Sequence, residues 1–406
     1  MPWRSFVFPS LSLAGALSLS CAAPQTGEAP TPSPRASGIA QATTRSTPAP
    51  AAPADDTEGD DAKKWDVTDP PGDWGWRDVE IDTTEGTWIS VDVSPDGSTL
   101  VFDLLGDIYA MPITGGDAKP LIQGLAWHMQ PRFSPDGSKI AFTSDRGAGD
   151  NIWVMNADGS EPRQVTKESF RLVNNPAWDP TGQYIVAKKH FTSKRSLGAG
   201  EMWLYHVSGG EGVQMTERPT EQKDVNDPAF SSDGTYLYYD RDATAGRFFE
   251  YNKDSSKQIY VIEKLDRKTG EISRLTGGPG GAARPTPSPD GKKLAFVRRV
   301  DYATTLFIRD LESGEEVPVV SDLERDNQEI WALHGVYPAM AWTPDSKALI
   351  FWDDGAIKRL DVDTQSVQTI PFRVRTTKKI AEVVRPKQQV FRDTFDVKML
   401  RHVLVS

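Results

Sequence analysis

The histidines and serines of this 406-residue chain are the first residues to consider as catalytic groups. The five histidines form none of the H-x-H, H-E-x-x-H or H-x-x-E-H patterns that hold a catalytic metal. No serine lies in a G-x-S-x-G turn, and no phosphate loop or dinucleotide fingerprint follows a predicted strand. We therefore expect no catalytic residue, no metal site and no cofactor in this chain.

One short loop carries oxygen ligands of the kind that calcium prefers. Residues 144–151 place Asp145, Asp150 and Asn151 near one another. The loop lacks the regularly spaced acidic residues of a calcium-binding loop, so a solvated hairpin is the favoured interpretation.

Two long insertions are the best candidates for binding. Residues 188–201 and 241–257 each lie between the second and third strands of a predicted repeat. Insertions at matching positions of a repeat project from one face, which is often the binding face. The candidate residues in these loops are Lys188, His190, Arg247, Phe248, Phe249 and Tyr251. The alternative is that both segments are ordinary long loops.

The elements that would position these loops recur along the chain. A segment such as QPRFSPDGSKIAF (130–142) occurs six times, at spacings from 40 residues (Pro95 to Pro135) to 57 residues (Ser232 to Pro289). The repeated turns begin at Pro95, Pro135, Pro180, Ser232, Pro289 and Pro344. Repeats of about this length that hold several short strands are typical of propeller blades.

The second repeat shows how one blade would form. Residues 130–134 lead into a Pro-Asp-Gly turn at 135–137, in which Pro presets φ and Gly accepts a positive φ. Further strands are predicted at 139–144, 151–155 and 162–166, each after a turn. Each repeat is thus a four-stranded antiparallel sheet, and the fold class is all-β: a propeller of about six blades.

The N-terminal residues indicate export. Residues 1–21 combine Arg4, a short apolar run and a small residue before Cys21, as in a secretory signal peptide. Ser18-Leu19-Ser20-Cys21 resembles a bacterial lipobox, which predicts lipidation of Cys21 and a cell-envelope or periplasmic location. The alternative is an ordinary signal peptide that ends near a cysteine. A lipid anchor at Cys21 would be the only contact with the membrane.

The remaining boundaries follow from composition. Residues 22–64 are rich in Pro, Ala and Thr and predict a disordered linker, and residues 65–371 hold the propeller. Residues 372–406 are interpreted as a connector and the start of a further repeat, so we expect a truncated chain. Residues 76–82 are expected to pair with the last blade and close the ring.

The net charge of −11 excludes general nucleic-acid binding.

The repeated pattern xPxFSPDGxxIAFxS, followed by IWVMNxDG, resembles the WD40-like (PD40) repeat of TolB-like propellers over residues 88–371. The chain is most similar to the N-terminal propeller of exported bacterial proteins in which such repeats precede an amidohydrolase domain. This resemblance implies a scaffold or substrate gate for a cell-envelope hydrolase whose catalytic domain is not in this chain. Its partner would be that downstream domain or an envelope protein. The alternative is a stand-alone TolB-like periplasmic scaffold that binds proteins and has no enzymatic activity.

Overall fold

The computed structural model describes residues 65–169, 171–192, 198–250, 253–254, 256–383, 394, 401–402 and 404–405. All of the regular secondary structure in these ranges is β-strand. No helix that could span a membrane occurs in this part of the chain. Cys21 and Tyr251 lie outside the described residues, so their predicted roles remain predictions.

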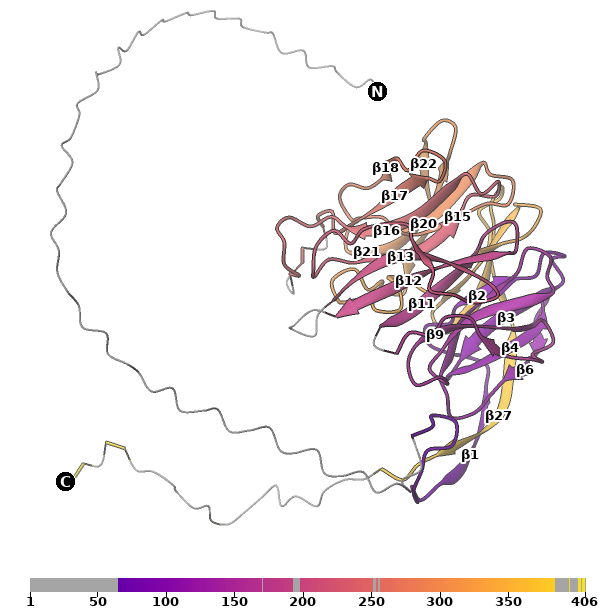
Figure 1. Cartoon of the computed structure of the whole chain (residues 1–406). Coiled ribbons are helices and arrows are strands. Elements are labelled where there is room, and N and C mark those ends of the chain that lie inside the picture. The colour runs from indigo at the N-terminus through magenta and orange to yellow at the C-terminus, as the bar shows by residue number, and fades with distance from the viewer. Residues whose placement is uncertain are drawn as a thin grey trace, which may run out of the picture. The chain divides into compact units, whose positions relative to one another are not determined.

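Six four-stranded antiparallel sheets follow one another along the chain and form the blades of a β-propeller (Figure 1). The first three blades are β2 (Val91–Val93), β3 (Thr99–Leu104), β4 (Asp107–Pro112) and β6 (Lys119–Ile122); β7 (His128–Phe133), β8 (Lys139–Ser144), β9 (Asn151–Asn156) and β10 (Arg163–Gln164); and β11 (Leu172–Trp178), β12 (Tyr184–Thr192), β13 (Gly198–His206) and β14 (Val213–Gln214). The last three are β15 (Val225–Phe230), β16 (Tyr236–Asp242), β17 (Tyr260–Asp266) and β18 (Ile272–Thr276); β19 (Ala283–Pro287), β20 (Lys293–Val300), β21 (Ala303–Asp310) and β22 (Glu316–Leu323); and β23 (Ala341–Trp342), β24 (Ala348–Asp353), β25 (Ala356–Asp361) and β26 (Val367–Ile370). The predicted all-β, six-bladed propeller is confirmed.

The ring closes by direct packing of the sixth blade on the first. Leu100 and Phe102 of the first blade share one buried cluster with Ile350 and Ile357 of the sixth. The backbone N–H of Val91 also donates to the carbonyl of Ala339, at 3.0 Å. Every blade therefore has an apolar neighbour on both faces, as the dense aliphatic content of the strands requires.

A seventh, three-stranded sheet lies outside the blades. In it, β1 (Arg77–Thr83) pairs antiparallel with β27 (Phe372–Ile380), and β27 pairs over two residues with β5 (Gly116–Asp117), which lies between β4 and β6 in the sequence. The expected pairing of 76–82 with the last blade is therefore wrong, because β26 already supplies the outer strand of that blade. The interpretation of 372–406 as a connector is also wrong for 372–380, which form β27.

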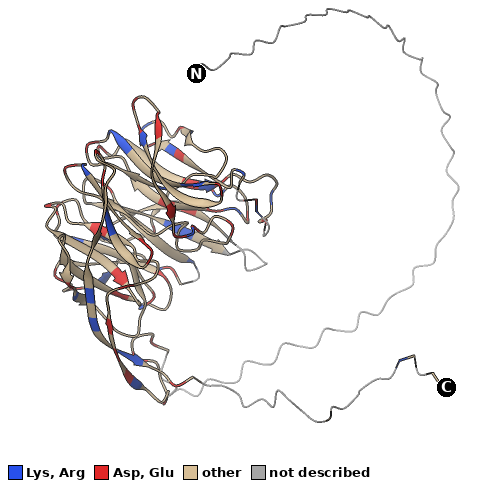
Figure 2. Cartoon of the chain, turned by 180° about the vertical axis from the view of Figure 1, so that it is seen from behind, with Lys and Arg blue, Asp and Glu red and all other residues tan. Residues whose placement is uncertain are grey.

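The ribbon of β1 and β27 is held to the propeller by apolar contacts and by charge, and Phe372 and Val374 of β27 belong to the buried cluster that contains Phe102. Lys378 Nζ lies 2.5 Å from Oδ1 of the fully buried Asp107 on the first blade. Arg373 donates two hydrogen bonds of 2.6 Å to the carboxylate of Asp82 across the ribbon. In this ribbon the charged residues of β1 are mostly acidic and those of β27 are basic. Charged residues of both signs are dispersed over the blades (Figure 2). The propeller surface is thus mixed in sign.

Candidate functional site

The Pro-Asp-Gly turns meet around one end of the central channel. In each turn the carboxylate accepts hydrogen bonds from the flanking hydroxyls, as Asp96 does from Ser94 Oγ (2.5 Å) and from the backbone N–H of Ser98 (3.0 Å). These bonds lower the pKa of Asp96 to about 2. The Asp side chains are thereby occupied in holding their own turns, as expected for a structural motif.

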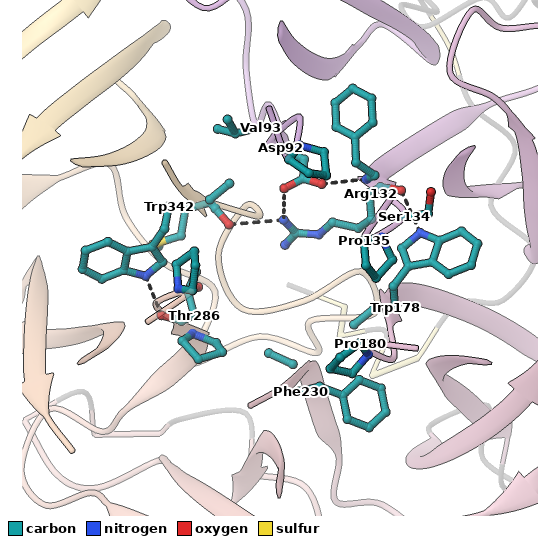
Figure 3. A pocket seen from close by; sticks show the side chains of 18 of the residues that line it. Asp92, Val93, Arg132, Ser134, Pro135, Trp178, Pro180, Phe230, Thr286 and Trp342 are labelled. Carbon is teal, nitrogen blue, oxygen red and sulfur yellow. Dashed lines mark hydrogen bonds and ion pairs between the residues drawn. The ribbon is translucent and has the colours of Figure 1, made fainter. Parts of the chain in front are cut away.

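A cavity of about 450 Å³ opens inside this ring of turns. Its wall consists of turn prolines and of the aromatic residues that precede them in four of the blades (Figure 3). Those aromatic residues are Phe133, Trp178, Phe230 and Trp342. We call this space the turn-face cavity. It is an apolar pocket of the size that usually binds ligands.

Two arginines line the turn-face cavity, and Arg284 is paired there with Asp227. The other is Arg132, whose Nη1 donates to Met340 O (3.2 Å) and lies 3.4 Å from Asp92 Oδ1. The second Asp92 oxygen accepts the backbone N–H of Phe133 (2.7 Å). Burial raises the pKa of Asp92, against the opposing effect of Arg132. Among the described residues, the hydrogen bonds of the Arg132 side chain all use Nη1. The guanidinium therefore keeps donors for a ligand (Figure 3).

Two tryptophans of the wall are fixed by hydrogen bonds to neighbouring blades. Trp178 Nε1 donates to Arg132 O, and Trp342 Nε1 donates to Thr286 O, each at 2.9 Å. Because each indole is anchored at its polar edge, its ring lies in a defined position on the cavity wall. The cavity is thus preformed, with apolar walls around a guanidinium.

A polar layer lies deeper in the channel. Gln130, Asn175, Asp227 and Arg284 occupy the same position in four successive blades, each with a positive φ of 53° to 61° and each followed by Pro. Gln130 and Asn175 hydrogen-bond to one another, and Arg284 Nη1 lies 2.5 Å from Asp227 Oδ1. These bonds join adjacent blades inside the channel.

The far end of the channel is covered by a segment that we call the plug, residues 326–336, between the fifth and sixth blades. It reaches across the ring: Gln130 Nε2 donates to His334 O (2.8 Å), and Val336 N donates to Asp227 Oδ2 (3.0 Å). His334 Nε2 lies 2.8 Å from Asp150 Oδ2 on the second blade. The plug therefore contacts blades from which it is distant in sequence and covers part of this end of the channel.

The structure corrects the placement of Lys188 and His190. Both lie in β12 and are buried beneath the plug, because the predicted insertion 188–201 is largely the paired ends of β12 and β13. Lys188 Nζ donates to Asp224 and Asn226 (2.6 Å each) and to Leu333 O of the plug (3.3 Å). Burial lowers the pKa of His190 to about 3. Lys188 is thus a plug anchor, and neither residue is on a binding loop.

The second insertion is a real loop, between β16 and β17. Arg247 and Phe248 are exposed, and Phe248 keeps 70% of its surface, whereas Phe249 is buried. Lys253 fixes the base of the loop: its Nζ lies 3.0 Å from Asp242 Oδ2 and 4.4 Å from the Phe249 ring centroid. Of the predicted residues of this loop that the structure describes, Arg247 and Phe248 are therefore the exposed ones.

The acidic loop 144–151 is occupied by protein contacts. Asp145 Oδ1 accepts the backbone N–H of Trp127 (2.7 Å), and Asn151 Oδ1 accepts the Thr166 hydroxyl (2.8 Å). Asp150 faces His334 of the plug. No group of three or more His, Cys, Asp or Glu in the described ranges is arranged to hold a metal ion.

Several known proteins are similar to this chain in sequence or in fold. Residues 90–265 match the family described as the tricorn protease N-terminal β-propeller domain. A Bacillus subtilis protein, uncharacterized peptidase YuxL, is 29% identical over 184 residues, which are 45% of this chain and 23% of that protein. The Tol-Pal system protein TolB of Helicobacter hepaticus is 28% identical over 160 residues, 38% of this chain and 37% of that protein. The crystal structure of TolB from Acinetobacter baumannii superposes with a TM-score of 0.52 at 16% identity, covering 75% of this chain and 67% of that one.

The fold and the closed ring define a six-bladed β-propeller. Over part of the chain, its repeats are similar to those of TolB and of the tricorn protease N-terminal β-propeller. The chain spans less than two fifths of the length of the peptidase and the TolB protein that it matches.

Residues that sequence reasoning missed are those of the turn-face cavity and the plug. Arg132 and Asp92 fall at a variable position of the repeat, two residues before the Ser of each Ser-Pro-Asp turn. A charged residue on a short strand that is otherwise buried between blades could have indicated this site, because a buried charge needs a partner.

Proposed function

We propose that this propeller is the docking and substrate-gating module of an exported hydrolase whose catalytic domain lies outside the chain. The observation that carries the proposal is the turn-face cavity, in which apolar walls surround a guanidinium with free donors. An extended polypeptide segment with apolar side chains and a carboxylate suits these groups.

The relatives support a hydrolase that acts on amide bonds. One relative is named a peptidase, and the matching family is a propeller of a protease. The sequence resemblance implies an amidohydrolase, and both classes cleave C–N bonds. Because the plug lies across the far end of the channel, the turn face is the side that we propose for the entry of a segment.

A second candidate is a stand-alone protein-binding scaffold, which the similarity to TolB favours. It requires the same cavity but no attached enzyme. Reading the coding frame past Ser406 separates the two: an H-x-H motif or a peptidase domain supports the first, and an immediate stop codon supports the second. Export through residues 1–21 and lipidation of Cys21 belong to both proposals, and mass spectrometry of the mature N-terminus tests them.

The binding proposal is tested by selecting linear peptides from a displayed random library on the full 406-residue chain. We expect selected peptides to carry apolar and acidic residues, and to lose at least about tenfold in affinity for an Arg132→Met variant. A matched control is Arg373→Met, an exposed arginine outside the cavity, which should bind normally. Equal binding to wild type and Arg132→Met would contradict the proposal.

A further inference from the structure

A second cavity, of about 400 Å³, lies on the opposite face of the propeller, beside the plug. We call it the plug-face cavity. The tip of the β3–β4 hairpin and Trp127 form one side, and Asn327 and other plug residues form the other. Successive hairpins of a blade lie at opposite strand ends, so this cavity is separate from the turn-face cavity and from the function proposed for it.

Trp127 forms a flat, rigid platform at the rim of this cavity. Its ring lies on Gly106, whose φ is +79° and where a Cβ would stand 2.7 Å from Trp127 Cε3. The Trp127 backbone N–H donates to Asp145 Oδ1, at 2.7 Å. Half of the Trp127 surface nevertheless remains exposed. Since glycine backbone covers one face of the indole, the exposed area includes the other face.

The polar groups nearest the open part of this platform are neutral, and the titratable groups of the lining are held by protein contacts. Thr87 and Asn327 line the cavity, and neither side chain is hydrogen-bonded among the described residues. The one carboxylate in the lining, Asp103, is buried and accepts the backbone N–H groups of Ser90 (2.8 Å) and Gln130 (2.6 Å). The described lining contains no Lys or Arg, and its two imidazoles are engaged by the protein: His128 Nδ1 lies 2.9 Å from Ser144 Oγ, and His334 Nε2 lies 2.8 Å from Asp150 Oδ2.

We propose that the plug-face cavity binds one ring of an uncharged glycan, stacked on Trp127. The C–H bonds on one face of a sugar ring carry partial positive charge and meet the electron-rich face of an indole favourably. The hydroxyls at the ring edge can then exchange hydrogen bonds with the amide of Asn327 and the hydroxyl of Thr87. A platform with neutral donors and acceptors suits this ligand better than it suits a nucleotide, which needs phosphate contacts.

The test is to titrate the full chain with cellohexaose, maltohexaose and chitohexaose and to measure binding of each by isothermal titration calorimetry. We expect at least one of them to bind, and Trp127→Ala to weaken its binding at least about tenfold. Trp127→Phe, which keeps an aromatic face, should retain part of the affinity. Trp178→Ala, on the turn face, should bind the sugar as wild type does.

Three results would overturn this proposal. One is the absence of binding of all three sugars at about 10 mM. Another is unchanged binding by Trp127→Ala, shown to be folded by a wild-type circular dichroism spectrum. The third is preferential binding of choline or adenosine monophosphate at Trp127, which would identify a cation or nucleobase platform instead. None of these results bears on peptide binding at the turn face.

Discussion

Gly97, in the Pro-Asp-Gly turn of the first blade, lies against the ring of Pro344, in the corresponding Pro-Asp-Ser turn of the sixth blade. A Cβ on Gly97 would stand 3.4 Å from Pro344 Cδ, and Gly137 and Gly234 have the same relation to Pro95 and Pro180 of the preceding blades. The turn motif therefore has two roles. It reverses each hairpin, and it packs each blade end against its neighbour, including the pair that closes the ring.

A bulky residue at Gly97 should consequently weaken ring closure. We expect Gly97→Val to lower the free energy of unfolding by about 3 kcal/mol, from the strain of a positive φ together with the clash with Pro344. Gly246→Val is the matched control, because Gly246 has a similar φ (+77°) and no atom within 4 Å of its Cβ position. Urea denaturation measures both. Equal losses in the two variants would show that the contact with Pro344 contributes nothing.

Lys188 should be essential to the anchoring of the plug. Lys188→Met leaves Asp224 buried without its cation, so we expect a loss of about 3–5 kcal/mol in unfolding free energy and faster proteolysis within 326–336. The double variant Lys188→Met/Asp224→Leu should recover much of that stability. Arg373→Ala breaks an ion pair that is exposed to solvent, so it should cost far less than Lys188→Met. If Lys188→Met cost as little as Arg373→Ala, the anchoring role would be wrong.

Asp103 should make the propeller less stable as pH rises from 4 to 7. Burial raises the pKa of Asp103 from its ordinary value of 3.8 to about 6, against hydrogen bonds from Gln130 and Ser90. Because the folded-state pKa lies above the unfolded value, stability from this group is fully present below pH 3.8. It is lost as pH rises through about 6.

The comparison with Asp103→Asn isolates this effect. Over the interval from pH 4 to pH 7, the unfolding free energy of wild type should fall by about 3 kcal/mol relative to the variant. The Asp103 carboxyl carbon should titrate near pH 6 in an NMR experiment, whereas that of Asp96 should titrate near 2. A parallel pH dependence in the two proteins would refute the assignment.

Local sequence predicted the blades but not the sites. In the second blade the predicted strand 139–144 is β8, because the Pro-Asp-Gly turn and the alternation beside it are local signals. The plug could not be predicted, since Gln130 meets His334 across 204 residues of sequence. The loop assignment of Lys188 and His190 failed for a different reason: polar residues that follow a strand resemble a loop when their buried partners are distant in sequence. The pairing of β1 with β27 also joins strands that are distant in sequence, so local patterns could not predict it.

The central claim is that polypeptide segments bind in the turn-face cavity. The most direct measurement is an NMR titration of the full chain with a selected peptide, following the indole N–H signals of Trp178, Trp342 and Trp127, each assigned from its Trp→Phe variant. Trp178 and Trp342 line the cavity and Trp127 lies on the opposite face. We predict saturable shifts of the Trp178 and Trp342 signals, with the Trp127 signal unchanged. Shifts confined to Trp127, or a peptide that binds without moving either cavity indole, would contradict the account.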